Sequence, residues 1–270
     1  MNRNYKEIYD KSLKNPEEFW QKISEDVFWF KKPTKILKKD NPPFYKWFED
    51  GVTNTCYNAL DLHIDQGRGD KTALIYDSPI TESKAKFTFK ELKEKVSKFA
   101  GALDKQGVKK GDRVIIYMPM IPEAVVAMLA CGRIGAIHSV VFGGFASNEL
   151  ASRIDDSKAK ILITASCGFE PGRTVEYRPL VDGALKLAKH QVEKVILFQR
   201  KGHEVKLNKP LEISWDEALS GADDKDCVEM GANDYAYILY TSGTTGIPKG
   251  IVRDIGGHIV ALKWTMKNIY

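Results

Sequence analysis

Long apolar runs are missing from this sequence, and none approaches the roughly 18 residues of a membrane-spanning helix. Cysteine is scarce, and its four residues are widely spaced: Cys56, Cys131, Cys167 and Cys227. This spacing matches neither a zinc motif nor a redox pair, and it predicts a reducing, cytoplasmic compartment. The polar opening, Met1 to Glu7, predicts neither a secretory signal nor a transit peptide.

A strong excess of one charge is also missing. The chain has 41 Lys and Arg against 36 Asp and Glu, a net charge of +5, with the two signs intermixed. No basic stripe marks a nucleic-acid surface, so we expect neither nucleic acid nor membrane as a partner. The densest basic run, Lys31 to Lys39, is interpreted as a solvated loop. With 43% hydrophobic and 29% charged residues, the composition is that of a globular protein.

Residues 1–65 are dense in aromatic side chains, from Tyr5 to Tyr57, and prolines divide them into short pieces. Such a stretch cannot build a large core by itself, so the rings are expected to pack on a neighbouring domain. A ligand platform for bases or sugars is the less favoured alternative. We therefore interpret 1–65 as an extension that precedes the main domain, 66–270.

From residue 71 onward, apolar strand patterns alternate with helical ones. Strands are expected at 72–76, 113–118, 137–141, 161–164, 194–198 and 235–240, and helices at 89–103, 122–135, 147–157, 180–189 and 257–270. Thr88 and Glu91 form a capping-box pattern, and Ser147 is a candidate cap. A polar loop is expected from the end of the first strand to Lys86. This alternation predicts an α/β fold with a mainly parallel sheet and ligands at the carboxyl ends of its strands.

The strongest motif directly follows the last predicted strand and reads Thr-Ser-Gly-Thr-Thr-Gly-Ile-Pro-Lys-Gly from Thr241 to Gly250. Glycines permit close backbone approach, hydroxyls and amides donate hydrogen bonds to phosphate oxygens, and Lys249 adds positive charge. The spacing differs from the common P-loop, G-x-x-x-x-G-K-[ST]. The predicted phosphate-binding residues are Thr241, Ser242, Gly243, Thr244, Thr245, Gly246 and Lys249. A polar turn between two strands is the bland alternative.

This motif resembles the phosphate loop of the adenylate-forming superfamily. Three more segments resemble its short-chain acyl-CoA synthetases, the acetyl- and propionyl-CoA synthetases: the early aromatic stretch, Gly135 to Phe145 with Arg153 to Ser157, and Gly168 to Arg173. The resemblance implies a ligase that uses ATP, Mg²⁺, coenzyme A and a small carboxylate, and forms acyl-CoA through an acyl-adenylate. It covers essentially the whole chain.

The segment Gly168 to Arg173 implies coenzyme A contact. In acetyl-CoA synthetases the loop commonly reads R-x-G-R and holds the nucleotide phosphate of coenzyme A. Here Gly172 and Arg173 match, but Glu170 replaces the first arginine, and a carboxylate cannot pair with phosphate. The Glu-Pro-Gly-Arg form is more like propionyl-CoA synthetases, so propionate is favoured over acetate. Gly143 and Gly144 either let the backbone approach the pantetheine arm or make a turn.

The resemblance also implies parts that this sequence does not contain. The acyl pocket, a ribose-binding aspartate and the carboxy-terminal domain with the adenylation lysine are expected beyond residue 270, so no catalytic residue and no metal ligand is assigned here. We expect an incomplete large domain that is inactive alone. His138 is interpreted as a packed core residue. Two alternatives stay open: an adenylate-forming ligase for aryl or medium-chain acids, and a non-catalytic nucleotide-binding protein.

Overall fold

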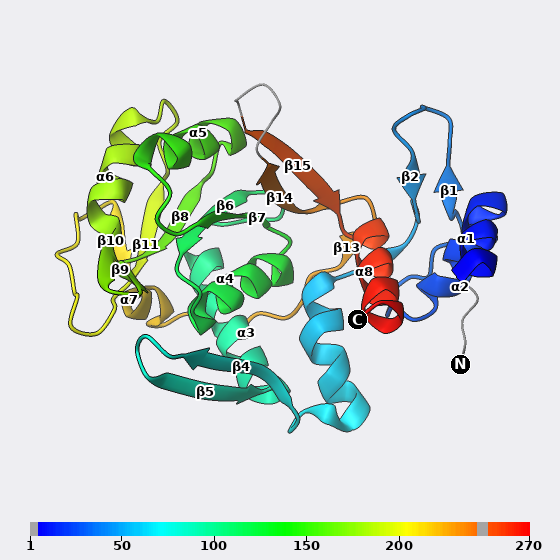
Figure 1. The fold of residues 1–270 in the computed structure, drawn as a ribbon, viewed down its shortest axis with the longest axis horizontal. Coiled ribbons are helices and arrows are strands. Elements are labelled where there is room, and N and C mark those ends of the chain that lie inside the picture. Colours follow the sequence, from blue (N-terminus) through cyan, green and yellow to red (C-terminus); the bar gives the residue numbers. More distant parts are fainter. Residues whose placement is uncertain (1–4, 242–247) are drawn as a thin grey trace.

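The computed structural model describes residues 5–241 and 248–270, and a seven-stranded sheet lies at its centre (Figure 1). The strand order is β12-β11-β8-β6-β7-β14-β15, and every pairing is parallel except that of β15 with β14. The strands are β6 (Arg113–Met118), β7 (Ile137–Phe142), β8 (Ile161–Ala165), β11 (Lys194–Phe198), β12 (Glu212–Ser214), β14 (Tyr235–Thr241) and β15 (Lys249–Asp254). The predicted α/β fold with a mainly parallel sheet is confirmed.

Helices cover both faces of this sheet (Figure 1). On one face α3 contacts both α4 and α7, and on the other α5 contacts α6. Their bounds are α3 (Phe89–Lys105), α4 (Pro122–Arg133), α5 (Ser147–Ser157), α6 (Tyr177–Leu187) and α7 (Trp215–Leu219). This arrangement follows from right-handed crossovers between parallel strands, and it brings all the carboxyl ends of those strands to one edge.

Local sequence explains where several helices begin. Thr88 and Glu91 exchange both bonds of a capping box at the start of α3, as predicted. Pro122 occupies the first turn of α4, where its missing N–H leaves no hydrogen bond unmade. The prediction for Ser147 was wrong, because Ala146 is the N-cap of α5 and Ser147 is the first helical residue. The Ser147 hydroxyl instead donates to the Leu180 carbonyl at 2.8 Å, joining α5 to α6.

Hairpins outside the central sheet were not predicted from the sequence, and two of them matter for the site. The predicted polar loop after the first strand contains β5 (Ser83–Thr88), which pairs antiparallel with β4 (Thr72–Ser78). Its exposed lysines alternate with Ala85 and Phe87, so the polar residues are the solvent side of a strand. A second hairpin joins β9 (Cys167–Glu170) to β10 (Arg173–Glu176).

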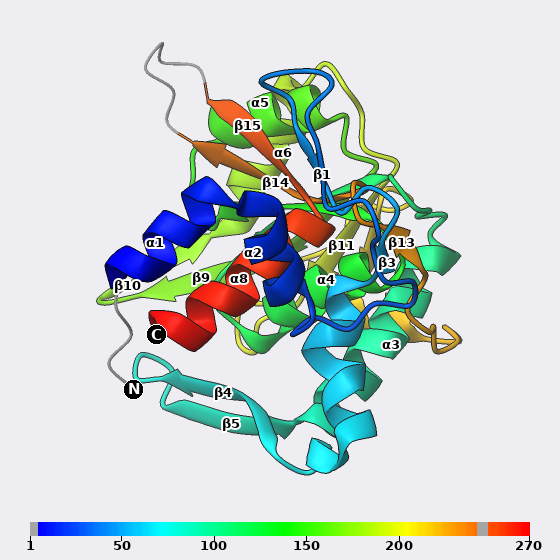
Figure 2. The same ribbon diagram turned by 90° about the vertical axis from the view of Figure 1, so that its right-hand side faces the viewer.

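The amino-terminal helices lie beside the last helix, α8 (Gly256–Asn268), as Figure 2 shows, and aromatic side chains of this region contact it. Trp20 lies edge-on to Trp264 with ring centroids 6.3 Å apart, and Phe48 shares a buried cluster with Ile259. The expectation that these rings pack against the rest of the chain is confirmed. The elements of this region are α1 (Tyr5–Lys14), α2 (Pro16–Ser24), β1 (Leu37–Lys38), β2 (Lys46–Trp47), β3 (Val52–Thr53) and the π-helical turns η1 (Tyr57–Asp61) and η2 (Ile64–Arg68).

One more short strand, β13 (Met230–Gly231), pairs antiparallel with β3 and ties this region to the main body. The large core lies between the sheet and α3, where Phe99 stacks on Trp215 with centroids 3.8 Å apart. Cys131 is fully buried in this core, as predicted. Among the described residues, no helix combines the length and the apolar character needed to span a bilayer.

Candidate functional site

The Ser/Thr/Gly motif lies at the carboxyl-end edge of the central sheet. Its flanks, Thr241 on β14 and Lys249 on β15, are register partners, and both are exposed. The segment between them therefore connects two antiparallel strands at the edge where ligands of parallel sheets bind. Most of the predicted phosphate contacts lie outside the described residues: Ser242, Gly243, Thr244, Thr245 and Gly246.

A polar contact fastens the base of this segment to α5. The Tyr240 hydroxyl donates to a carboxylate oxygen of Asp156 at 2.6 Å, and the Arg153 guanidinium lies 5.2 Å from the Tyr240 ring centroid. Burial and the Asp156 carboxylate raise the pKa of Tyr240, so the phenol keeps its proton at neutral pH. Tyr240, the residue directly before Thr241, is thus held in place by its contact with α5.

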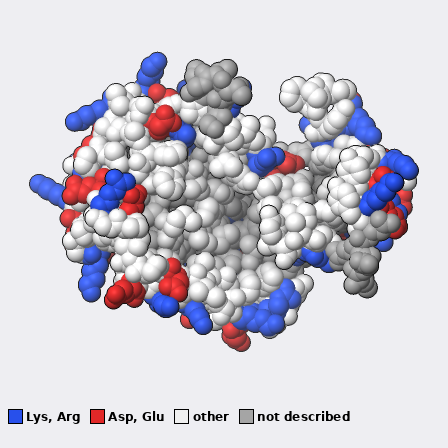
Figure 3. Space-filling model, viewed as in Figure 1, with Lys and Arg blue, Asp and Glu red and all other residues white. Residues whose placement is uncertain are grey.

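A cavity of about 500 Å³ lies beside this segment, at the ends of β6, β7 and β14. Its walls are mostly apolar, and several side chains are unusually exposed for their type, with Met120 88% and Phe142 63% accessible. Exposed apolar surface of this kind marks a place for a ligand or another protein segment. Figure 3 shows that most of the face in that view is uncharged, with acidic and basic side chains at its rim.

Tyr177 forms one wall of this cavity and packs between two glycines. A Cβ atom at Gly143 would lie 2.1 Å from the Tyr177 hydroxyl oxygen, and one at Gly168 would lie 2.6 Å from it. Neither position accepts a larger residue unless the ring moves. Burial raises the pKa of Tyr177, so its hydroxyl is a neutral hydrogen-bond donor at the cavity wall.

The backbone turns sharply after β7. Gly144 has a φ of +102°, a value that favours glycine, and its N–H donates to the Tyr117 hydroxyl at 3.1 Å. Tyr117 in turn donates to the Phe145 carbonyl at 2.8 Å. These contacts support the turn interpretation of Gly143 and Gly144, and Gly143 also lines the cavity, so contact with a ligand is compatible with the turn.

Arg173 lies on the β9–β10 hairpin and is paired with the residue that breaks the acetyl-type pattern. Its Nη2 lies 2.6 Å from a Glu170 carboxylate oxygen, and 71% of its side chain is exposed. Gly172 has a φ of +75° and makes the tight turn that brings the two side chains together. A phosphate that binds Arg173 must therefore compete with Glu170 for the guanidinium.

His138 is half-buried and lies outside the buried core clusters, so the predicted core role holds only for the inner side of its ring. Its Nδ1 is buried without a partner among the described residues, and its ring lies 5.5 Å from that of Tyr237. Burial lowers the pKa of His138 to about 4, so the ring is neutral at physiological pH. A neutral ring at the centre of the sheet, away from the cavity lining, has no evident part in binding.

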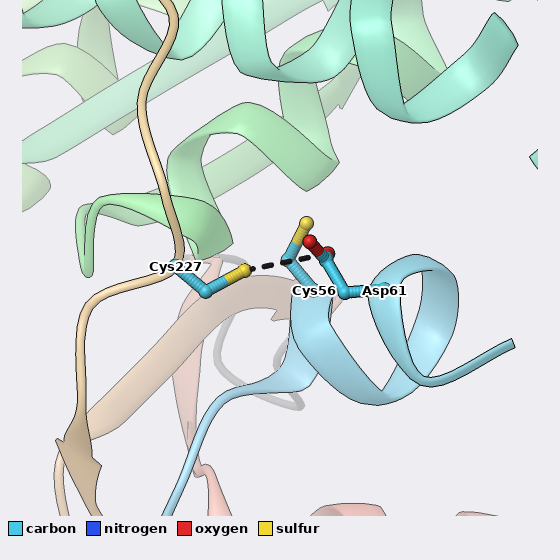
Figure 4. A group of neighbouring side chains, drawn as sticks. All are labelled: Cys56, Asp61 and Cys227. Atoms are coloured by element: carbon cyan, nitrogen blue, oxygen red, sulfur yellow. Dashed lines mark hydrogen bonds between the residues drawn. The ribbon is translucent and has the colours of Figure 1, made fainter. Parts of the chain in front are cut away.

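The described residues offer little to a divalent cation at the carboxyl-end edge. Asp156 is engaged by Tyr240, and Glu170 by Arg173. In the described part of the chain, the one group with metal-ligand spacing is Cys56, Asp61 and Cys227 (Figure 4), in the part of the molecule where α4 ends. Soft sulfur ligands do not suit Mg²⁺. A Mg²⁺ ion that accompanies a nucleotide would thus be bound by the nucleotide phosphates and by residues other than Asp156, Glu170 and the Cys56–Asp61–Cys227 group.

The sequence alone did not identify several residues that shape the site. Tyr177, Arg200, Met118, Met120 and Leu239 line the cavity. Their positions in the sequence could have indicated them, since ligands bind at the carboxyl ends of parallel strands. Met118 ends β6, Leu239 lies near the end of β14, and Tyr177 begins the helix that follows the second hairpin. Nothing in the local pattern showed that Tyr177 would lie against Gly143.

Comparisons with known proteins bear on this site. The family model described as AMP-binding enzyme matches residues 63–269, and the model described as Acetyl-coenzyme A synthetase N-terminus matches residues 5–59. The human protein named acyl-CoA synthetase short-chain family member 3, mitochondrial, is 53% identical over 267 residues, which are 98% of this chain and 39% of that protein. Acetyl-coenzyme A synthetase of Xylella fastidiosa is 44% identical over 98% of this chain and 42% of its own length.

A solved structure, acetoacetyl-CoA synthetase from Streptomyces lividans, superposes with a TM-score of 0.87 at 26% identity. The match covers 97% of this chain and 40% of that one. The chain therefore spans about two fifths of the length of these relatives, with 39% of the human protein covered.

Proposed function

Because this chain belongs to the AMP-binding enzyme family, we propose that it acts as an acid–thiol ligase of the acyl-CoA synthetase type and binds the phosphates of ATP at the carboxyl-end edge of its central sheet. The proposed contacts are the hydroxyls, amides and lysine of the motif: Thr241, Ser242, Gly243, Thr244, Thr245, Gly246 and Lys249. The observation that carries this proposal is the pairing of Thr241 with Lys249 at that edge.

The reaction we propose has two halves. A carboxylate oxygen attacks the α-phosphorus of ATP, giving an acyl-adenylate and pyrophosphate, and the coenzyme A thiol then attacks the acyl carbon and expels AMP. Mg²⁺ supplies charge neutralisation on the phosphates when bound. The whole reaction requires the remaining length that the relatives have, so these 270 residues alone are proposed to be inactive.

Coenzyme A is proposed to lie along the apolar cavity toward Gly172 and Arg173. The cavity wall supplies apolar contact and the Tyr177 hydroxyl as a donor, while Arg173 is the cation nearest the second hairpin's turn. Because Glu170 already pairs with Arg173, the guanidinium is pre-positioned but partly neutralised. This supports coenzyme A recognition that is weaker at the phosphate than a pair of arginines would give.

We propose propionate as the preferred acid and acetate as the second. The Glu-Pro-Gly-Arg form of the hairpin, in which Glu170 replaces an arginine, supports this order. We also propose a division near residue 65 between the extension and the nucleotide-binding domain. The four free thiols support a reducing compartment, and the human relative's name places that protein in mitochondria.

The test is acid-dependent exchange of pyrophosphate into ATP by the full-length protein. Gly243→Val is expected to abolish exchange, because a side chain there prevents close approach of the backbone to phosphate. Gly202→Val, at an exposed glycine in a loop outside the motif, is the matched control and should retain it. Propionate should give a higher kcat/KM than acetate or benzoate. Normal exchange in a folded Gly243→Val protein would show that the motif does not bind ATP.

A further inference from the structure

A buried polar cluster lies in the part of the molecule where α4 ends and η1 begins. The sulfur atoms of Cys56 and Cys227 and a carboxylate oxygen of Asp61 all lie within 4.8 Å of one another (Figure 4). The two cysteines come from segments far apart in the sequence, one before η1 and one in the loop between α7 and β13. Sequence spacing alone did not predict that these thiols would meet.

The pairing of β3 with β13 explains the meeting. Thr53 is the register partner of Met230, and Val52 that of Gly231, in an antiparallel ladder. The ladder ends at Thr53, and Cys56, three residues later, has α-helical backbone angles at the start of η1. The short ladder together with this helical turn brings the sulfur atoms of Cys56 and Cys227 within 4.8 Å of each other.

A metal ion does not suit this cluster, because a cation already occupies its centre. The guanidinium of Arg133 is fully buried, and its Nη1 lies 2.8 Å from Asp61, 3.2 Å from the Cys227 sulfur and 3.6 Å from the Cys56 sulfur. A metal bound by these three ligands would be adjacent to that charge. Lys93 adds a second cation, 3.2 Å from the other oxygen of Asp61.

The charges of the cluster favour a thiolate instead. Arg133 and Lys93 face one buried carboxylate, since Asp226, 4.0 Å from Arg133, is fully solvated. One negative charge on sulfur would balance the group. The neighbouring Cys227 thiol lowers the pKa of Cys56, and Arg133 acts in the same direction against burial, while the Cys227 thiol itself donates to an Asp61 oxygen at 3.6 Å.

The other two cysteines lack these features. Burial raises the pKa of Cys131 to about 12, and burial also raises that of Cys167. Cys131 is fully buried, while Cys227 is partly exposed and gives a small oxidant a route to the pair. The hydrogen bond to Cys56 and burial raise the pKa of Cys227 too, so the pair is distinguished by geometry, with its two sulfurs within 4.8 Å of each other, and by the lowered pKa of Cys56.

We propose that Cys56 and Cys227 form a redox-active dithiol whose disulfide fastens the amino-terminal segment to the loop that leads into β13. The oxidant is a hydroperoxide. The Cys56 thiolate attacks an oxygen of hydrogen peroxide, and the O–O bond breaks to release hydroxide. The Cys227 sulfur then attacks the sulfenic sulfur of Cys56, the S–O bond breaks, and water leaves with the Cys227 proton. The two sulfurs lose two electrons and the peroxide gains them.

The disulfide would act on a loop that is already tightly held. A Cβ atom at Gly101 on α3 would lie 1.6 Å from the Asp223 carbonyl oxygen, and Ser97 donates to the Lys225 carbonyl at 2.6 Å. Arg133 donates to that same carbonyl at 2.5 Å. Oxidation therefore adds a covalent link between two segments that the fold has already placed with their sulfurs within 4.8 Å of each other.

The experiment maps thiols in the purified protein after treatment with hydrogen peroxide. Tryptic digestion without reduction separates the cysteines, because Cys56 lies in peptide 47–68 and Cys227 in peptide 226–249. We expect these two peptides to be joined, with the loss of two hydrogens, and to separate with dithiothreitol. The melting temperature should rise by roughly 5–10 °C on oxidation.

Cys167→Ser is the matched control and should behave as the wild type, whereas Cys56→Ser and Cys227→Ser should lose both the link and the thermal shift. The wild-type peptide map needs no variant, so misfolding of a variant leaves the test intact. Peroxide that leaves peptides 47–68 and 226–249 unlinked would overturn the proposal. Stoichiometric zinc binding that both serine variants abolish would also overturn it and would identify a metal centre.

Discussion

Two arginine–carboxylate pairs illustrate how differently two parts of this molecule are built. Arg133 and Asp61 form a two-pronged pair in which the arginine side chain is fully buried, and Arg133 also donates to a backbone carbonyl. Arg173 and Glu170 form a similarly short pair on a hairpin where 71% of the arginine side chain is exposed. The first pair joins distant segments, while the second joins residues three positions apart.

The difference teaches that burial, more than contact distance, decides what an ion pair does. Burial by itself raises the pKa of Asp61, but hydrogen bonds and charge from Arg133 hold the pKa below its usual value. Removing one partner there would leave a charge without compensation in a dry environment. At the exposed pair, water replaces a lost partner, so the arginine is available to a ligand.

The largest effect is expected from Arg133→Met. It should lower the free energy of unfolding by about 3–5 kcal/mol, because Asp61 stays buried while its main partner is lost. Urea denaturation measures this. Arg173→Met is the matched control at the exposed pair and should change stability by less than about 0.5 kcal/mol. Equal losses in the two variants would show that the comparison between the pairs is wrong.

A smaller effect is expected where the cavity wall meets β7. Gly143→Ala should destabilise the protein by about 1–3 kcal/mol, because its Cβ would meet the Tyr177 hydroxyl at 2.1 Å. Adding Tyr177→Phe, which removes that oxygen, should restore part of the stability. A double-mutant cycle by thermal denaturation gives the coupling.

If Gly143→Ala is stable but raises KM for coenzyme A, the glycine serves ligand approach more than packing. The cycle would then show no coupling between the two positions. Either outcome sharpens the contrast between the buried and the exposed part of the molecule. Overpacking in the core lowers stability, whereas loss of a ligand contact raises KM.

The smallest effect is expected from Arg173→Ala in the full-length protein. KM for coenzyme A should rise by about fivefold, the equivalent of roughly 1 kcal/mol, because one exposed charge contact to phosphate is lost. Pyrophosphate exchange should be unchanged. Glu170→Gln should act in the opposite direction, since it frees Arg173 from its partner. A rise in KM for ATP with no change for coenzyme A would contradict this assignment.

Much of the fold could be predicted because its signals are local. The strand at 113–118 agrees with β6, and the capping box at Thr88 begins α3 as expected. These features depend on hydrophobic alternation and on hydrogen bonds within one turn, which neighbouring residues set. The hairpin strand β5 was missed, because its alternating lysines resemble a polar loop until the partner strand is known.

The candidate site divides in the same way. The composition of the segment from Thr241 to Gly250 by itself made phosphate binding the leading hypothesis, because glycines, hydroxyl side chains and a lysine occur together in one short run of residues. The meeting of Cys56 with Cys227, of Tyr177 with Gly143 and of Glu170 with Arg173 was decided only by the tertiary structure. The hairpin register pairs Glu170 with Arg173, while the other two contacts depend on how separate helices and loops pack, so no single stretch of sequence contains them.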